Sequence, residues 1–422
     1  MKTVAAFITV FSIVLVVSFV WADALPTAKP EQVGLSSQRL ERLGQALKAQ
    51  IADGRFPGAV AVVARKGRIA YFESVGQLDP VGGTPMSKDA IFRLYSMTKP
   101  FTSVAAMMLV EQGKLTLADP VSKYLPQLGK LEVAILKQGP DGKSTYELVP
   151  AESQMTIQDL LRHTSGLAYA NNTRNARVKE LYGAIGVDWR DVTPAEQLER
   201  LAKAPLAHEP GTAWEYSLST DVLGRVIEVV SGMPLSAFLA ERVFAPLKMT
   251  DTAFVVSKAQ VGRLAQPFAT DKATGKPITL LDVTVPQKND AGGAGTAGTA
   301  GDYARFLQML LNGGQLDGAR MLSRTTVAYM TSDHLGAIKP AIPLLQPGYG
   351  FGLGFAVRKD SGVNAVPGSA GEFTWGGAAG TGFWVDPKEQ LICIVMTQTQ
   401  PGPAQRYDRA LFRQLVQQAI ID

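Results

Sequence analysis

The amino-terminal part of the chain switches from one hydrophobic period to another. Between residues 31 and 52, leucines recur three or four positions apart, which predicts an amphipathic helix that ends at Gly54. The apolar runs 59–64 and 69–72 lie on either side of Gly67 and predict a β-hairpin. We therefore expect a helix followed by two antiparallel strands at this end of the chain.

The middle of the chain carries mainly helical patterns. A helix is expected from Ser96 to Val110, with Gly113 at its carboxyl cap and Pro100 in its first turn, where a helix tolerates proline. Beyond it, residues 114–290 read as helices joined by long loops. The helical segments are 156–161, 194–201 and 218–230, the last continuing to 239.

Strand patterns return near the carboxyl end. Asp302 is expected to open a helix over 303–311, and a last helix covers 404–420. The strands expected between them are 350–357, 373–376, 380–385 and 391–396. Strands at both ends with helices between them predict an α+β fold, in which one antiparallel sheet is built from the two chain ends. Residues 25–95 and 291–422 then form the sheet domain and residues 96–290 a mainly helical inserted domain, with the active site at their junction.

The first residues resemble a targeting segment. Lys2 precedes a nearly continuous apolar stretch over 3–20, and Ala22-Asp23-Ala24 is a small-residue cleavage site. This pattern predicts a signal peptide over 1–24, cleaved after Ala24, and a periplasmic or secreted protein. An uncleaved membrane anchor is the alternative, because the apolar stretch is nearly long enough to span a bilayer. No other long apolar stretch follows, so no stable membrane span is expected after cleavage.

Composition and charge exclude several classes of function. The 422 residues are 46% hydrophobic and 19% charged, which is typical of a globular protein. The net charge of +5 is scattered without basic runs, so no nucleic-acid partner is expected. The single cysteine, Cys393, lies in an apolar strand pattern and can form no internal disulfide. The three histidines share no metal-ligand spacing, and neither a metal nor a cofactor is expected.

The segment Ser96-Met97-Thr98-Lys99 has the spacing of a nucleophile and its base. Residues three positions apart on a helix share one face, so the serine hydroxyl and the lysine amine are expected to lie about one turn apart. A lysine whose ammonium form is disfavoured can take the proton of the hydroxyl, as hydrolases without a catalytic histidine require. Alone, this short motif also occurs by chance, so its context decides its meaning.

Two later segments complete a candidate site. Tyr216 stands on a loop just before a helical pattern, where its hydroxyl can face a cleft and move a proton. Trp375-Gly376-Gly377-Ala378 places two glycines in a late strand, which indicates either a bulge or a close approach of backbone to ligand. An oxyanion hole requires such an approach, and its donors are expected to be the backbone N–H groups of Ser96 and Ala378.

In this order and at these distances, the three motifs resemble the family VIII carboxylesterases, the ester-cleaving relatives of class C β-lactamases and penicillin-binding proteins. The resemblance runs from about residue 31 to the end. It includes the segments His163-Thr164-Ser165-Gly166-Leu167, Pro246-Leu247-Lys248-Met249-Thr250 and Gly292-Gly293 through Asp302-Tyr303. It implies a β-lactamase/transpeptidase-like fold, with Ser96 as nucleophile, Lys99 as its partner and Tyr216 as the third catalytic residue. Trp375, Gly376 and Gly377 then stand where β-lactamases have Lys-Thr-Gly.

Two departures from the β-lactamase pattern concern the substrate. Leu218 replaces the amide of Tyr-x-Asn, and Trp375 replaces the lysine of Lys-Thr-Gly. Neither an aliphatic side chain nor an indole can bind the carboxylate and amide groups that β-lactams carry. We therefore expect Leu218, Trp375, Gly376 and Gly377 to contact neutral, apolar esters, with weak β-lactam hydrolysis as a side activity.

Two other features are weaker candidates. Residues 293–298 match G-x-G-x-x-G, but neither a preceding strand pattern nor a βαβ unit surrounds them, so a flexible loop beside the cleft is expected in place of a dinucleotide site. Of the three histidines, only His163 is expected near the cleft, where it turns the loop or contacts substrate.

The sequence thus predicts a serine hydrolase that cleaves short- to medium-chain carboxylic esters through an acyl-enzyme, with a small-molecule ester as its partner. Lys99 and Tyr216 are both candidates for the base, and the choice between them stays open because two interacting groups share their protons. The alternatives are a β-lactamase or D-Ala-type peptidase of the cell envelope and a non-catalytic binding protein of the same fold. The sequence specifies neither the natural ester nor the oligomeric state.

Overall fold

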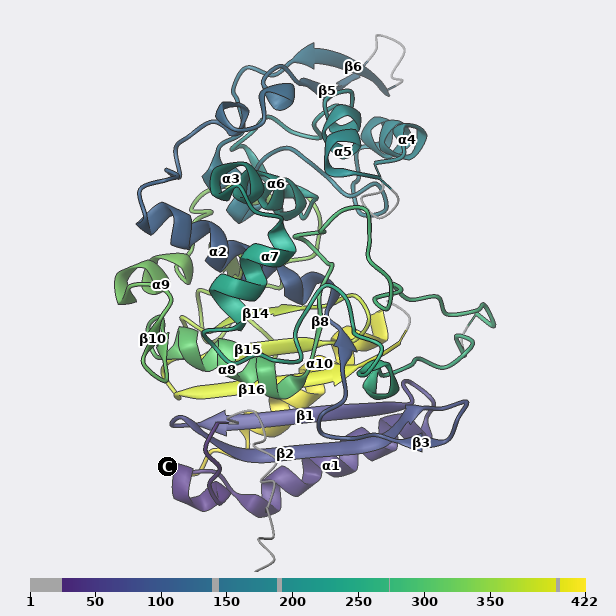
Figure 1. Cartoon of the computed structure of the whole chain (residues 1–422), viewed down its shortest axis with the longest axis vertical. Coiled ribbons are helices and arrows are strands. Elements are labelled where there is room, and N and C mark those ends of the chain that lie inside the picture. The colour runs from purple at the N-terminus through teal and green to yellow at the C-terminus, as the bar shows by residue number, and fades with distance from the viewer. Residues whose placement is uncertain (1–24, 139–143, 188–191, 273, 400–402) are drawn as a thin grey trace, which may run out of the picture.

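The two ends of the chain meet in one eight-stranded antiparallel sheet of the order β12-β13-β14-β15-β16-β1-β2-β3. The computed structural model describes residues 25–138, 144–187, 192–272, 274–399 and 403–422. Figure 1 shows the first strands beside the last ones, and Ala59 of β1 pairs with Thr397 of β16. The sheet strands are β1 Gly58–Arg65, β2 Arg68–Asp79, β3 Thr84–Pro85, β12 Tyr349–Phe351, β13 Ala356–Arg358, β14 Phe373–Gly376, β15 Gly382–Asp386 and β16 Leu391–Thr397.

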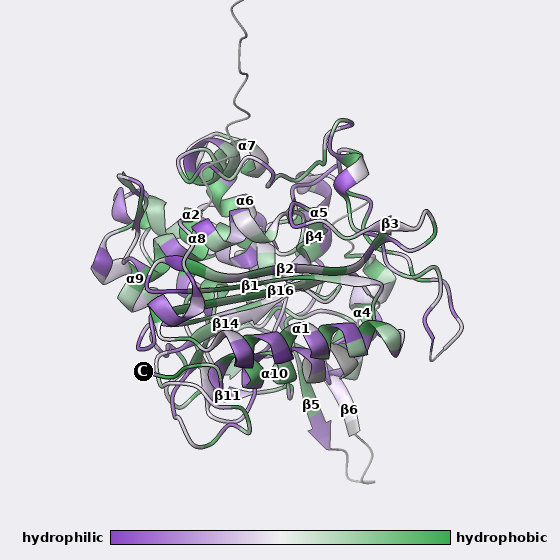
Figure 2. Ribbon diagram, turned by 90° about the horizontal axis from the view of Figure 1, so that it is seen from below, coloured by the Kyte–Doolittle hydropathy of each residue, from purple (hydrophilic) through white to green (hydrophobic). Residues whose placement is uncertain are grey.

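Helices cover both faces of this sheet (Figure 2). Helices α1 (Ser37–Ala52) and α10 (Pro403–Gln417) pack together on one face, and α8 (Ala300–Leu311) packs on β1 and β16 from the other. Side chains alternate across a strand, so β1 serves two cores. Val60 and Val62 point into the larger core, whereas Ala59 and Val63 point toward α1 and α10. Burial on both faces explains why this strand is a continuous apolar run.

The central part of the chain is mainly helical. Its helices are α2 Lys99–Glu111, α3 Ile157–Arg162, α4 Ala176–Ile185, α5 Pro194–Leu201, α6 Ser219–Ser231 and α7 Leu235–Leu239. The shorter elements of the chain are β4 Phe92–Arg93, β7 Ala213–Trp214, β8 Ala297–Gly298, β9 Gln315–Leu316, β10 Ala319–Arg320, α9 Arg324–Met330 and β11 Lys339–Pro340. The predicted α+β architecture is confirmed, while the exact division into 25–95 with 291–422 and 96–290 stays a prediction.

One hairpin lies where the sequence predicted only helices and loops. Strands β5 (Glu132–Gln138) and β6 (Ser144–Pro150) pair far from the main sheet, at the top of Figure 1. Only Val133 and Ala134 of β5 are buried, so its apolar stretch is too short to distinguish a strand from a turn of helix.

Capping and turn residues shift several predicted boundaries. The first helix begins at Ser37, because Gly34 in the left-handed region ends a separate 3-10 helix and Ser36 caps α1. The predicted helix 218–239 breaks at Gly232, which also has positive φ. The predicted strand 350–357 is two strands, β12 and β13, which pair with each other. Thr299, rather than Asp302, caps α8.

Two expectations concern membranes and export. Within the described residues, no single helix has the length and hydropathy to cross a bilayer, although α6 and the segment Leu235–Phe244, bent by 80°, meet these criteria together. The predicted signal peptide and the cleavage site after Ala24 lie outside the described residues, so both stay predictions.

Candidate active site

Ser96 lies on a tight turn at the entrance to α2. Residues Tyr95–Thr98 form a 3-10 turn, and α2 begins only at Lys99, three residues later than expected for the helix. The preceding residue, Tyr95, has a φ of 47°, which is uncommon for a bulky side chain. Its ring is buried and its hydroxyl accepts a hydrogen bond from the N–H of Leu281 at 2.7 Å. The surrounding contacts therefore hold a strained turn that exposes Ser96.

Lys99 and Tyr216 converge on the Ser96 hydroxyl. The phenol of Tyr216 donates to Oγ of Ser96 at 2.5 Å, and Nζ of Lys99 lies 3.5 Å from the same oxygen. Lys99 is buried at 1% exposure, and its Nζ stands 4.6 Å from the centre of the Tyr216 ring. The three residues that the sequence analysis put forward as catalytic are thus in mutual contact, which is the geometry that proton transfer from a serine nucleophile requires.

A buried network fixes the amine of Lys99. It donates to the carbonyl oxygen of Gly293 at 2.7 Å and to the hydroxyl of Tyr169 at 3.2 Å. The carboxylate of Asp221 accepts from the N–H of Gly293 at 2.9 Å and from Tyr169 at 3.4 Å. Burial raises the pKa of Asp221, against the opposing effect of the nearby Lys99 charge. Lys99 therefore has a carboxyl group close by but no direct salt bridge to it.

The G-x-G-x-x-G segment has a structural role at this network. A Cβ on Gly293 would lie 2.5 Å from a carboxyl oxygen of Asp221, so a glycine is needed there. Residues 291–300 are buried, and Gly292 and Gly293 among them lie against α2 and α6, which corrects the expectation of a flexible loop beside the cleft.

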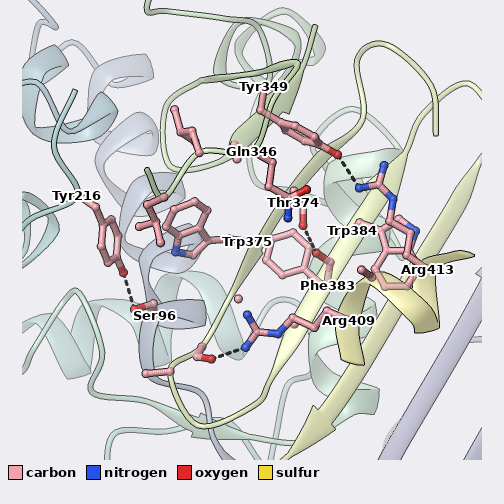
Figure 3. A pocket seen from close by; sticks show the side chains of 18 of the residues that line it. Ser96, Tyr216, Gln346, Tyr349, Thr374, Trp375, Phe383, Trp384, Arg409 and Arg413 are labelled. Atoms are coloured by element: carbon pink, nitrogen blue, oxygen red, sulfur yellow. Dashed lines mark hydrogen bonds between the residues drawn. The ribbon is translucent and has the colours of Figure 1, made fainter. Parts of the chain in front are cut away.

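Ser96 and Tyr216 open into a cavity of about 590 Å³ (Figure 3). One wall is the segment from Trp375 to Ala378, which contains the predicted W-G-G motif. Apolar side chains contribute much of the remaining lining: Leu344, Leu345, Ala356, Val366, Phe383 and Trp384. Gln346, Tyr349, Arg409 and Arg413 add polar groups. This volume lies within the range of small-molecule sites.

The end of β14 approaches Ser96 closely. Strand β14 is third from the edge of the sheet, but its pairing with β13 covers only Phe373 and Thr374, whereas the pairing with β15 continues to Gly376. A Cβ on Gly377 would lie 2.2 Å from the carbonyl oxygen of Leu94, so this residue must be glycine for the backbones to meet. Ala378 consequently lines the same cavity as Ser96, and its role as an oxyanion donor stays a prediction.

The structure does not bring His163 or Leu218 to the cavity. Leu218 is buried in the core at the start of α6, at 3% exposure. His163 ends α3 with positive φ, accepts a hydrogen bond from the N–H of Ser217 at 3.3 Å, and packs 5.0 Å from the ring of Tyr216. Burial lowers the pKa of His163 well below its usual value, and the Lys99 charge acts in the same direction. Neither side chain is among those that line the cavity, and the expected contacts of His163 and Leu218 with substrate stay predictions.

Three further residues at the site were not found from the sequence: Tyr169, Asp221 and Arg409. Asp221 lies in the first turn of α6, where the helix dipole favours an acidic residue. Its position in the sequence therefore did not indicate a role at the active site. Among the described residues, no three His, Cys, Asp or Glu side chains are arranged to hold a metal ion.

Comparisons with known proteins identify the family and the fold. Residues 43–418 match the model of the Beta-lactamase family. Esterase EstB of Burkholderia gladioli is 34% identical over 380 residues, which cover 85% of this chain and 90% of that protein. The solved structure of EstCE1, a hydrolase with promiscuous acyltransferase activity, is 30% identical with a TM-score of 0.73, covering 90% of this chain and 98% of that one. Simvastatin synthase (LovD) of Aspergillus terreus, at 24% identity, a TM-score of 0.73 and the same coverage, shares the fold. The expected β-lactamase/transpeptidase-like fold is confirmed.

Proposed function

Because this chain belongs to the Beta-lactamase family of serine hydrolases and is similar to esterases, we propose that it is a carboxylesterase that works through an acyl-enzyme on Ser96. The observation that carries the proposal is the convergence of Tyr216 and Lys99 on the Ser96 hydroxyl, at 2.5 Å and 3.5 Å. Such a convergence activates a serine without a histidine.

The reaction proceeds in two halves. In the first, Oγ of Ser96 attacks the ester carbonyl carbon and its proton passes to Tyr216 or Lys99. The negative charge on the former carbonyl oxygen is stabilised by the backbone N–H groups of Ser96 and Ala378. The bond to the alkoxy oxygen then breaks, Tyr216 returns the proton to the leaving alcohol, and the acyl group remains on Ser96. In the second half, water attacks the acyl carbon and gives a proton to the same pair of residues. The bond between that carbon and Oγ of Ser96 then breaks, the pair returns the proton to Oγ, and the acid leaves.

The lining of the cavity favours neutral esters of short to medium length. Trp375 and the apolar side chains around it present hydrocarbon to the acyl or alcohol group. An indole at position 375 offers no cation for the carboxylate of a β-lactam, and the two arginines of the lining are already bonded, Arg409 to the carbonyl of Gly377 and Arg413 to Glu372. A β-lactamase or D-Ala-type peptidase is therefore the weaker alternative.

The test compares esters with a β-lactam on one preparation. Wild-type protein should hydrolyse p-nitrophenyl acetate and butyrate faster than a chromogenic cephalosporin. Ser96→Ala should lower ester turnover by a factor of about 10⁴ or more. Faster cephalosporin turnover would favour a β-lactamase. Absence of both activities, together with failure of Ser96 to react with a fluorophosphonate, would favour a non-catalytic binding protein.

Acyl transfer to an alcohol is a second candidate activity. It is suggested by the similarity to EstCE1, a hydrolase with promiscuous acyltransferase activity, and by the apolar lining of the cavity. An alcohol that attacks the acyl-enzyme in place of water yields a new ester through the same proton transfers. Adding a primary alcohol should then divert product from free acid to the new ester; unchanged acid yield would exclude this activity.

We also propose that the protein is exported. Lys2, the apolar stretch over 3–20 and Ala22-Asp23-Ala24 support a cleaved signal. Amino-terminal sequencing of the protein from a periplasmic fraction or culture medium should give Leu25 as the first residue. An intact apolar segment in a membrane fraction would support the anchor instead.

A further inference from the structure

Arg409 reaches from α10 to the backbone at the active site. Its Nη2 donates a hydrogen bond to the carbonyl oxygen of Gly377 at 2.5 Å (Figure 3). The same oxygen accepts from the N–H of Gly380 at 3.3 Å, which closes a turn around Ala378. Arg409 lines the cavity together with Ser96 and Ala378. A guanidinium from the last helix thus contacts the turn that carries the expected oxyanion donor.

The sheet leaves space for this side chain. Gly376 of β14 lies directly opposite Gly382 of β15. A Cβ on Gly376 would lie 2.5 Å from Nη1 of Arg409, and a Cβ on Gly382 would lie 3.0 Å from its Cδ. Glycine weakens a strand unless something must approach closely, and here the approaching group is the arginine. The first glycine of the W-G-G motif therefore accommodates Arg409, while the second allows the contact with Leu94.

The bonded carbonyl and the N–H of Ala378 belong to one peptide group. That group is planar and trans, so its oxygen and its N–H point in opposite directions and fixing one fixes the other. A cationic donor on the carbonyl oxygen also polarises the amide and strengthens its N–H as a donor. Both effects act on charge that develops in the transition state, where preorganised donors contribute most.

We propose that Arg409 is a positioning residue for the oxyanion donor Ala378; the proposal rests on the proposed esterase function. Arg409 orients and polarises the Gly377–Ala378 peptide and touches no reacting atom. Its removal should therefore weaken oxyanion stabilisation while Ser96, Lys99 and Tyr216 stay in place.

The test measures kcat/KM for p-nitrophenyl acetate and for its thiono analogue, in which sulfur replaces the carbonyl oxygen. Sulfur is larger and accepts hydrogen bonds weakly, so an oxyanion hole favours the oxygen ester. Arg409→Gln should lower kcat/KM for the oxygen ester about ten- to hundredfold and for the thiono ester much less. Arg409→Lys should recover part of the loss, and Arg42→Gln, the same change at an exposed position of α1, should have no effect.

Three results would overturn the proposal: wild-type kcat/KM in Arg409→Gln, an equal loss on both esters, or a loss confined to substrates that carry a carboxylate. If Arg409→Gln is not folded, as judged by the loss of cooperative unfolding, Gly376→Ala is measured in its place. Its added methyl group displaces the guanidinium and should lower the ratio of kcat/KM for the oxygen ester to kcat/KM for the thiono ester in the same way. Ser96→Ala is measured in parallel. Activity in Ser96→Ala would refute the esterase mechanism, whereas an inactive Ser96→Ala beside a wild-type Arg409→Gln would refute only the role of Arg409.

Discussion

The phenolic hydroxyl of Tyr216 donates a hydrogen bond of 2.5 Å to Oγ of Ser96, although 120 residues separate them in the chain. Packing of α2 against α6 brings the two together, since each residue lies just before one of these helices. The ring of Tyr216 is held by neighbouring rings: its centroid lies 5.1 Å from Trp375, 5.3 Å from Tyr169 and 5.0 Å from His163. The hydroxyl is therefore positioned before substrate arrives.

Tyr216→Phe removes only this hydroxyl. The ring contacts persist, so the melting temperature should change little, while kcat on p-nitrophenyl acetate should fall by about 10²–10⁴, the usual contribution of a general acid or base. Tyr329→Phe, at an exposed tyrosine, is the matched control. A kcat within about twofold of wild type would remove Tyr216 from the proton path.

Lys99→Met should lower ester turnover far more than it lowers stability. The methionine fills a site that is 1% exposed, but it leaves the carbonyl oxygen of Gly293 without this donor. We therefore expect a loss of about 1–3 kcal/mol in the free energy of unfolding, with the fold retained. Ester turnover should drop about 10³-fold or more, because Ser96 loses a proton-transfer partner. Kinetics and thermal unfolding are compared with Lys48→Met on the exposed side of α1. Unimpaired turnover would contradict the role of Lys99.

His163 should make the protein less stable at acid pH. Its pKa in the folded state lies well below 6.5, so the unfolded chain binds a proton that the folded chain does not. The free energy of unfolding therefore decreases as pH falls through 6.5, by up to about 1.4 kcal/mol per pH unit for this one group. His163→Asn keeps an acceptor for Ser217 and tolerates positive φ. Denaturant unfolding at several pH values should show a shallower acid slope in the variant; identical slopes would refute this assignment.

Gly377→Ala should destabilise the end of β14. The added methyl group would lie 2.2 Å from the carbonyl oxygen of Leu94, so the strand must move away from Ser96. We expect a loss of about 1–3 kcal/mol in the free energy of unfolding, together with a loss of ester turnover. Gly183→Ala in α4 is the control, because no atom lies within 4 Å of its added Cβ and alanine favours a helix. Equal stability of the two variants would contradict this packing.

Local patterns predicted the parts of the fold and site that depend on neighbouring residues. The β1–β2 hairpin follows from two apolar runs around a turn, and the approach of Lys99 to Ser96 follows from helical spacing. The hydrogen bonds of Lys99 to Gly293 and Tyr169 join segments far apart in the chain, which no local spacing reveals. The space that Arg409 occupies depends on Gly376 of β14 facing Gly382 of β15, and this register is set only when the sheet forms.

Trapping the acyl-enzyme tests the central claim most directly. Protein mixed with p-nitrophenyl acetate is quenched with acid within milliseconds and analysed by intact mass and by peptide mapping, beside Ser96→Ala. The mechanism predicts one added acetyl group, located on the peptide that contains Ser96, and none in the variant. An acetyl group on another residue, or full turnover by Ser96→Ala, would contradict it.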